Sequence, residues 1–138
     1  MIGTRSCLIA LTAIFAFIGS AASAMAQPFD GNWSIAAQTT RGHCENIEFP
    51  VAIRDGEVFS AGGAAYGGYA AQVRGRVSPD GRALVEAAAG PRVAQGAGQL
   101  GQYEGSGTWA GRGPSGVCSG VWRAYRHWFS LPFFPARF

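Results

Sequence analysis

The stretch AQVRGRVSPDGRALVE, residues 71–86, decides the fold class of this chain. Val73 and Val77 fall on one face of an extended backbone, and Arg74 and Arg76 fall on the other. This alternation predicts a strand with one buried face and one hydrated face. The Pro-Asp-Gly that follows predicts a tight turn, because proline presets the first turn dihedral and glycine adopts positive φ without steric cost. The stretch therefore predicts two antiparallel strands joined by a turn.

The same pattern continues on both sides of this hairpin. Asp55-Gly56 separates two further apolar stretches, and other turn signals stand at Gly90-Pro91 and in residues 113–116. After residue 26, no stretch offers ten residues of helical periodicity without a glycine. Strands are predicted at residues 31–37, 45–54, 57–60, 68–77, 83–88, 93–100, 103–109 and 116–125.

Many short, evenly spaced strands predict an all-β fold. Successive tight turns favour a single small antiparallel up-and-down barrel of about eight strands, since closure removes the exposed edges. A flattened β-sandwich is the alternative. The chain has 138 residues, of which 14% are charged and 21 are glycine, and this size suits one domain. We expect the glycine-rich residues 61–68 to form a loop, which is a candidate lid.

Residues 1–26 have the pattern of a signal peptide. Arg5 precedes an apolar run at residues 7–18, and Ala24-Met25-Ala26 forms an A-x-A cleavage site. A membrane anchor is the alternative, but the run is shorter than the roughly 20 residues that span a bilayer. The sequence thus predicts a barrel-like domain at residues 27–126, located in the periplasm or secreted, with no membrane span after cleavage.

Two cysteines, Cys44 and Cys118, follow the predicted cleavage site. In an exported chain they most simply form one disulfide, with two free thiols as the alternative. No Cys-x-x-Cys or Cys/His spacing points to a metal, so no metal site and no cofactor are predicted.

Aromatic residues are the best candidates for a binding site. Trp33, Trp109 and Trp122 can surround a sugar ring or a flat apolar ligand, and Tyr66 and Tyr69 stand near glycine-rich turns where they can form a pocket rim. The alternative places the tryptophans in the barrel core, where each contributes a large buried area.

The C-terminal residues 127–138 differ in character from the rest of the chain. They contain two prolines, which exclude a regular central strand, and the aromatic residues Trp128, Phe129, Phe133 and Phe134. An apolar segment of this kind usually marks a contact surface, so these four residues are candidates for binding a partner.

The sequence does not assemble a catalytic site. Its two histidines, His43 and His127, show no pattern that pairs either with a nucleophile and an orienting group. A formal net charge of +3, carried by arginine without lysine, is too small to indicate nucleic-acid binding. We therefore expect no catalytic residues and a binding function.

Three phrases resemble those of a group of small exported proteins of Gram-negative bacteria: FDGNW at residues 29–33, GSGTWAG at 105–111 and CSGVW at 118–122. The resemblance covers residues 29–126. The group carries no established activity, so the resemblance implies a compartment and implies no function.

Gly31-Asn32-Trp33 is also similar to the G-x-W signature of lipocalins, and the layout is similar to that of lipocalin and avidin barrels. This likeness implies a barrel whose base is closed by Trp33. A signal peptide, one disulfide and an early tryptophan also resemble the layout of small periplasmic barrels that inhibit secreted metalloproteases.

Together these observations predict a non-catalytic binding protein that holds a small apolar or sugar-like ligand in the mouth of the barrel. The alternative is a protein-binding module of the cell envelope or a periplasmic protease inhibitor. The expected partner is thus an unidentified small ligand or an envelope protein.

Overall fold

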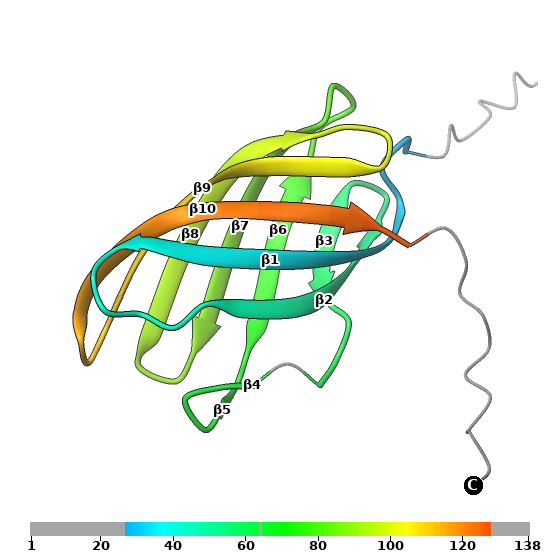
Figure 1. Ribbon diagram of the computed structural model, residues 1–138. Helices are drawn as coiled ribbons and strands as arrows, with labels where there is room; N and C mark the ends of the chain where they lie inside the picture. Colours follow the sequence, from blue (N-terminus) through cyan, green and yellow to red (C-terminus); the bar gives the residue numbers. More distant parts are fainter. Residues whose placement is uncertain (1–26, 64, 128–138) are drawn as a thin grey trace, which may run out of the picture.

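The computed structural model of the protein describes residues 27–63 and 65–127. Within these two ranges the fold is all-β and contains no helix. Eight strands form a closed antiparallel barrel (Figure 1). They are β1 (Gly31–Arg41), β2 (Ile47–Arg54), β3 (Glu57–Ser60), β6 (Gln72–Val77), β7 (Arg82–Ala89), β8 (Arg92–Leu100), β9 (Glu104–Gly113) and β10 (Gly116–Arg126).

Pairing of the first strand with the last closes the barrel. The order around the wall is β1-β10-β9-β8-β7-β6-β3-β2, and β1 pairs with both β10 and β2. Strands that follow one another in the barrel sequence are neighbours, as in an up-and-down barrel. The predicted eight-strand barrel is therefore confirmed.

The two ends of the barrel differ in their loops. We call one end the base: it holds residues 27–30, the turn after β2 and the C-terminal end of β10 at Arg126. We call the other end the mouth: it holds the loop between β1 and β2, residues 61–63 and 65–71, and the turns before β8 and β10. The last described residue, His127, lies at the base, where its backbone N–H donates to the Asn32 carbonyl.

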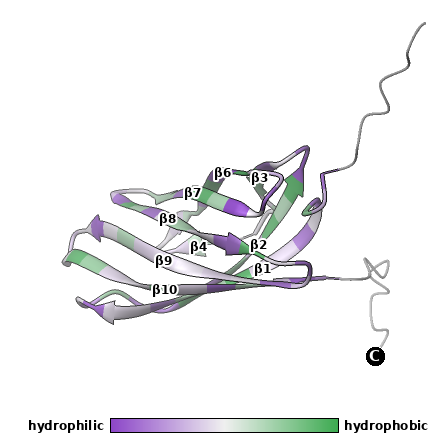
Figure 2. Cartoon of the chain, turned by 90° about the horizontal axis from the view of Figure 1, so that it is seen from above, coloured by the Kyte–Doolittle hydropathy of each residue, from purple (hydrophilic) through white to green (hydrophobic). Residues whose placement is uncertain are grey.

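Inward and outward residues alternate along the strands as the sequence predicts. Val73 and Val77 are buried inside the barrel, whereas Arg74 and Arg76 are exposed on the outer wall. Ile47, Phe49, Val51 and Ile53 likewise share the inner face of β2. Val51 and Ile53 belong to the core, and Phe49 packs against it. Bands of hydrophobic and hydrophilic residues can be followed along the strands in Figure 2.

The predicted turn at Asp55-Gly56 joins β2 to β3 at the base. Both residues have positive φ, 52° and 73°, which is typical of a type I′ hairpin turn. The carboxylate of Asp30 accepts hydrogen bonds from both of their backbone N–H groups, at 2.8 and 3.2 Å. The FDGNW phrase therefore fixes the turn of the next hairpin as well as the start of β1.

The glycine-rich segment is more ordered than the predicted loop. It contains a separate two-stranded hairpin, β4 (Ala65–Tyr66) paired with β5 (Tyr69–Ala70), at the mouth end (Figure 1). Ala71 divides β5 from β6, so the single strand predicted at residues 68–77 is wrong. The tyrosines supply the anchors that the glycines lack, as described below.

The predicted disulfide is confirmed. Cys44 and Cys118 are bonded, with 6.1 Å between their Cα atoms, and the bond ties the β1–β2 loop to β10 at the mouth. The two cysteines are separated by 74 residues. In the chain-entropy model a loop of that length stabilises the fold by roughly 4 kcal/mol.

Within the described ranges, no helix is long and apolar enough to cross a membrane. The predicted signal peptide, residues 1–26, lies outside these ranges, as does the aromatic tail from residue 128 onward.

Candidate ligand-binding cavity

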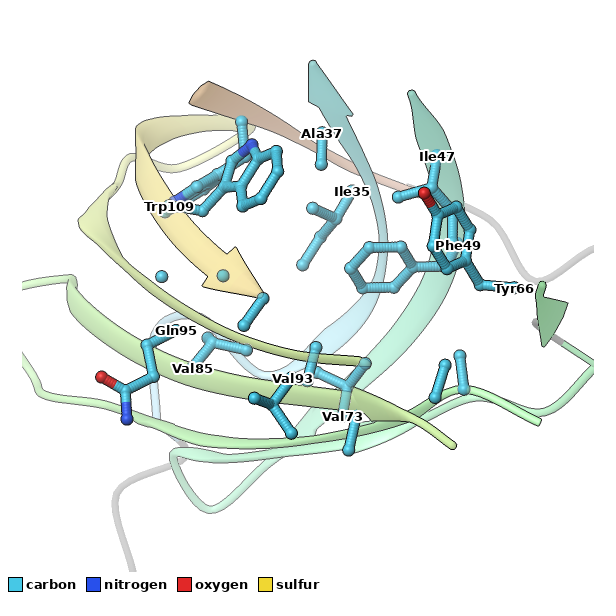
Figure 3. A pocket seen from close by; sticks show the side chains of 18 of the residues that line it. Ile35, Ala37, Ile47, Phe49, Tyr66, Val73, Val85, Val93, Gln95 and Trp109 are labelled. Atoms are coloured by element: carbon cyan, nitrogen blue, oxygen red, sulfur yellow. The ribbon is translucent and has the colours of Figure 1, made fainter. Parts of the chain in front are cut away.

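The interior of the barrel holds a cavity of about 160 Å³ (Figure 3). Its wall is built from the inward-facing residues of all eight barrel strands. Ile35, Phe49, Val85 and Trp109 surround it, and Ala37 and Ile47 lie toward the mouth; Figure 3 shows these side chains together. The cavity is therefore formed by the same alternation that builds the core.

The lining is almost wholly apolar below the mouth. Its lower part is lined by buried residues with exposed fractions of 5% or less: Val51, Ile53, Val77 and Leu100. Among the described residues, no polar or charged residue is fully buried. The cavity therefore offers contact area rather than hydrogen bonds to anything it holds.

Two of the predicted tryptophans lie on this wall. The Nε1–H of Trp122 donates to the Thr108 carbonyl at 3.2 Å, and the Nε1–H of Trp109 donates to the Gln38 carbonyl at 3.1 Å. Because backbone carbonyls of the barrel already accept both indole protons, these residues present their carbon rings to the cavity. Their contribution to the site is apolar.

Glycines make room for these rings. A Cβ atom on Gly98 would stand 2.4 Å from Cζ2 of Trp122, and one on Gly107 would stand 2.6 Å from Cε2 of the same ring. A Cβ on Gly120 would stand 2.9 Å from Nε1 of Trp109. The glycines of β8, β9 and β10 thus form a flat wall on which the two indoles lie.

The rim of the mouth carries charge. Arg92, Arg112 and Glu45 line it together with Ser115 and Tyr66. Arg92 occupies an inward-facing position at the start of β8, and its guanidinium carbon lies 5.2 Å from the centre of the Tyr66 ring. Such a cation–π contact fixes the guanidinium at the edge of the apolar cavity.

The β4–β5 hairpin is fastened to this rim through its tyrosines. The hydroxyl of Tyr66 accepts a hydrogen bond from the backbone N–H of Glu45 at 3.0 Å. Gly67 lies against the Arg92 guanidinium, since a Cβ there would stand 2.4 Å from Nη1. On β5, the ring of Tyr69 lies over Gly90 in the turn before β8. The hairpin therefore lies against two sides of the mouth.

Trp33 occupies a different place from Trp109 and Trp122. It is 1% exposed at the base, does not line the cavity, and donates its Nε1–H to the Phe29 carbonyl at 2.9 Å. The guanidinium of Arg126 lies over its ring at 5.6 Å and donates to the carbonyls of Pro28, at 3.1 Å, and of Asp30. These contacts close the base.

The candidate residues therefore fall into three groups. Trp109, Trp122 and Tyr66 line the cavity, whereas Trp33 lies at the base and Tyr69, 49% exposed, lies outside the lining. Trp128, Phe129, Phe133 and Phe134, the candidates for binding a partner, lie outside the described residues.

Sequence reasoning missed Phe49 and Arg92 as site residues. The alternation of residues 47–53 places Phe49 on an inner face and was a usable signal. Arg92 stands one residue before the strand predicted at 93–100 and directly after Gly90-Pro91, so the sequence pattern places it in a turn, whereas it begins β8.

A Ser–His pair and a carboxyl with a lowered pKa both lie away from the cavity. Ser34 Oγ is 2.7 Å from His127 Nε2, but this pair is on the exposed outer wall near the base. A hydrogen bond from Ser78 lowers the pKa of the Asp80 carboxyl, which lies in the β6–β7 turn at the base. Among the residues that the structure describes, no three His, Cys, Asp or Glu side chains gather to hold a metal ion.

No protein-family model, curated protein or solved structure matches this chain.

Proposed function

We propose that this protein is a non-catalytic binding protein that holds a small apolar molecule inside its barrel. The observation that carries the proposal is the cavity of about 160 Å³ with its apolar lining. Burial of apolar surface is the main driving force for binding at such a site. The Ser34–His127 pair contributes nothing here, because it lies on the outer wall.

The size of the cavity limits the size of the ligand. An engineered protein cavity of roughly 150 Å³ binds benzene, whereas drug-sized ligands occupy sites of roughly 300 to 1,000 Å³. We therefore infer a ligand, or an apolar part of one, with the dimensions of a single six-membered ring or a short alkyl chain. The satisfied indole N–H groups of Trp109 and Trp122 favour an apolar ligand over a sugar.

The same proposal places the protein in the periplasm or outside the cell. The Cys44–Cys118 disulfide supports this location, because such bonds persist in oxidising compartments. The apolar run at residues 7–18 and the A-x-A site that follows it support export through a cleaved signal peptide.

A variant that fills the cavity tests the binding function. Ala87 lies on the inner wall of β7, and Ala87→Phe places a phenyl ring inside a space that has the size of one. We expect toluene to shift the indole N–H resonances of Trp109 and Trp122 in NMR spectra of the unmodified protein. We expect no such shifts in Ala87→Phe.

The matched control is Ala97→Phe, which places the same ring on the exposed outer face of β8. This variant should bind toluene as the unmodified protein does. Absence of any toluene-dependent shift in the unmodified protein, up to the solubility limit of toluene, would overturn the proposed function.

A further inference from the structure

Arg92 is a charged side chain at the opening of an apolar cavity. It belongs to the inward-facing row of β8 that continues with Ala94, Gly96, Gly98 and Leu100. Every later member of this row is apolar or glycine, so the cation stands where the apolar lining meets solvent.

A comparison with Arg126 shows what Arg92 lacks. At the base, the Arg126 guanidinium donates to the carbonyls of Pro28, Asp30 and Gln102 as well as lying over Trp33. At the mouth, the Arg92 guanidinium contacts the face of the Tyr66 ring, and within residues 27–63 and 65–127 it makes no hydrogen bond or ion pair. Among the described residues, its N–H donors therefore have no acceptor and can serve a ligand.

The contact with Tyr66 orients the guanidinium and leaves these donors available. A guanidinium is planar and its N–H groups lie in that plane, whereas an aromatic ring attracts it as a cation without accepting a conventional hydrogen bond. A planar fork of donors matches the two oxygens of a carboxylate. Arg92 is thus preorganised toward an acidic group at the mouth.

The charge balance of the rim points the same way. Among the described residues that line the cavity, two arginines, Arg92 and Arg112, stand against one acid, Glu45. A carboxylate held at this rim keeps contact with water, so its binding avoids the large desolvation cost of a deeply buried charge.

We propose that the ligand is a small monocarboxylate, with its apolar part in the barrel cavity and its carboxylate paired with Arg92. This inference rests on the proposed function, and it adds the chemical class of the ligand. It also explains why the hairpin contacts Arg92: Tyr66 and Gly67 hold the guanidinium in place at the entrance.

Two ligands of the same shape and different charge test this proposal. Benzoate and benzamide share a ring and a planar head group, but only benzoate is ionised at pH 7. We expect the unmodified protein to bind benzoate about tenfold more tightly than benzamide in NMR titrations that monitor the indole N–H of Trp109. The expected preference corresponds to one charge-assisted contact at a partly hydrated site.

Variants at one arginine of the rim and one arginine outside the cavity locate the contact. Arg92→Gln should remove the preference for benzoate and leave benzamide binding unchanged, because the cavity itself is intact. Arg123→Gln is the matched control, since Arg123 lies at an exposed position of β10 and does not line the cavity, and it should keep the preference. An equal loss in both variants would overturn the assignment to Arg92.

The outcomes separate this inference from the proposed function. If the unmodified protein binds benzamide as tightly as benzoate, the acidic ligand is wrong and the apolar site stands. If toluene, benzamide and benzoate all fail to bind, the proposed function is wrong and the ligand class is wrong with it.

Discussion

Gly98 faces Gly107 across the β8–β9 ladder, and the ring of Trp122 covers both. A methyl group on Gly98 would stand 2.2 Å from the Ser106 carbonyl oxygen as well as 2.4 Å from the indole. We therefore expect Gly98→Ala to lower the free energy of unfolding by about 1 to 3 kcal/mol, as overpacking of a core does. Urea denaturation followed by tryptophan fluorescence measures this change.

Gly96 supplies the control, because it lies two residues earlier in the same inward-facing row. A methyl group there would stand 3.4 Å from Nε1 of Trp122 and 3.7 Å from the Thr108 carbonyl, which are ordinary contact distances. Gly96→Ala should cost less than about 1 kcal/mol. Equal destabilisation by both variants would mean that the Trp122 ring does not lie on Gly98 as described.

The sequence predicts whether a side chain points into or out of the barrel better than it predicts the position of that side chain along the barrel axis. Alternation correctly places Val73 and Val77 inside. It does not separate Trp33 at the base from Trp109 at the cavity, because both face inward. Their positions along the barrel axis depend on whether each strand begins at the base or at the mouth, and only the assembled topology determines this.

The β4–β5 hairpin is fastened to the mouth by the hydrogen bond between the Glu45 N–H and the Tyr66 hydroxyl. Tyr66→Phe removes this acceptor and keeps the ring under Arg92. One such bond contributes about 1 kcal/mol, so the hairpin should open about fivefold more often. Amide hydrogen exchange at residue 69, which pairs with Tyr66 across the hairpin, should be faster by that factor.

Tyr69→Phe is the matched change on the partner strand. Within the described residues the Tyr69 hydroxyl makes no hydrogen bond, and its ring lies over Gly90 with or without the hydroxyl. Exchange at the backbone amide of residue 69 should therefore stay at the unmodified rate. If Tyr66→Phe also leaves the rate unchanged, the hydroxyl contact does not hold the hairpin closed.

The sequence predicts the barrel strands, but it does not predict the two strands of the β4–β5 hairpin. The sequence predicts the strand at residues 57–60 with correct bounds, because an Asp-Gly turn precedes it and alternation continues through it. Strands of two residues, such as β4 and β5, are too short to show any period. The hairpin is held in place by contacts with Glu45, Gly90 and Arg92, which are distant from it in the sequence.

Closure of the barrel is a property of the complete chain. The other seven pairings of the wall join strands that follow one another in the barrel sequence, whereas the β1–β10 pairing joins the two ends of the domain. Local sequence patterns are therefore also compatible with a flattened sandwich. The Cys44–Cys118 bond lies beside the long-range pairing of β1 with β10, at the mouth.

The β1–β10 ladder closes the barrel, and the disulfide should therefore add stability to a barrel that is already closed. Cys44→Ala combined with Cys118→Ala frees a loop of 74 residues, and we expect the free energy of unfolding to fall by about 2 to 4 kcal/mol. The barrel should stay closed, because the β1–β10 register runs from Trp33 to Arg41 independently of the bond. Circular dichroism of the folded variant and its urea midpoint measure the two effects.

Reduction of the unmodified protein isolates the bond from the loss of the sulfur atoms. Cys118 is 1% exposed, so part of the cost of the double variant comes from the packing that its side chain provides. The reduced protein should lose most of the same stability and, since Ile35, Phe49 and Trp109 remain on the inner wall, should still bind toluene. Loss of the β-sheet signal on reduction would show instead that the disulfide, rather than the β1–β10 ladder, keeps the barrel closed.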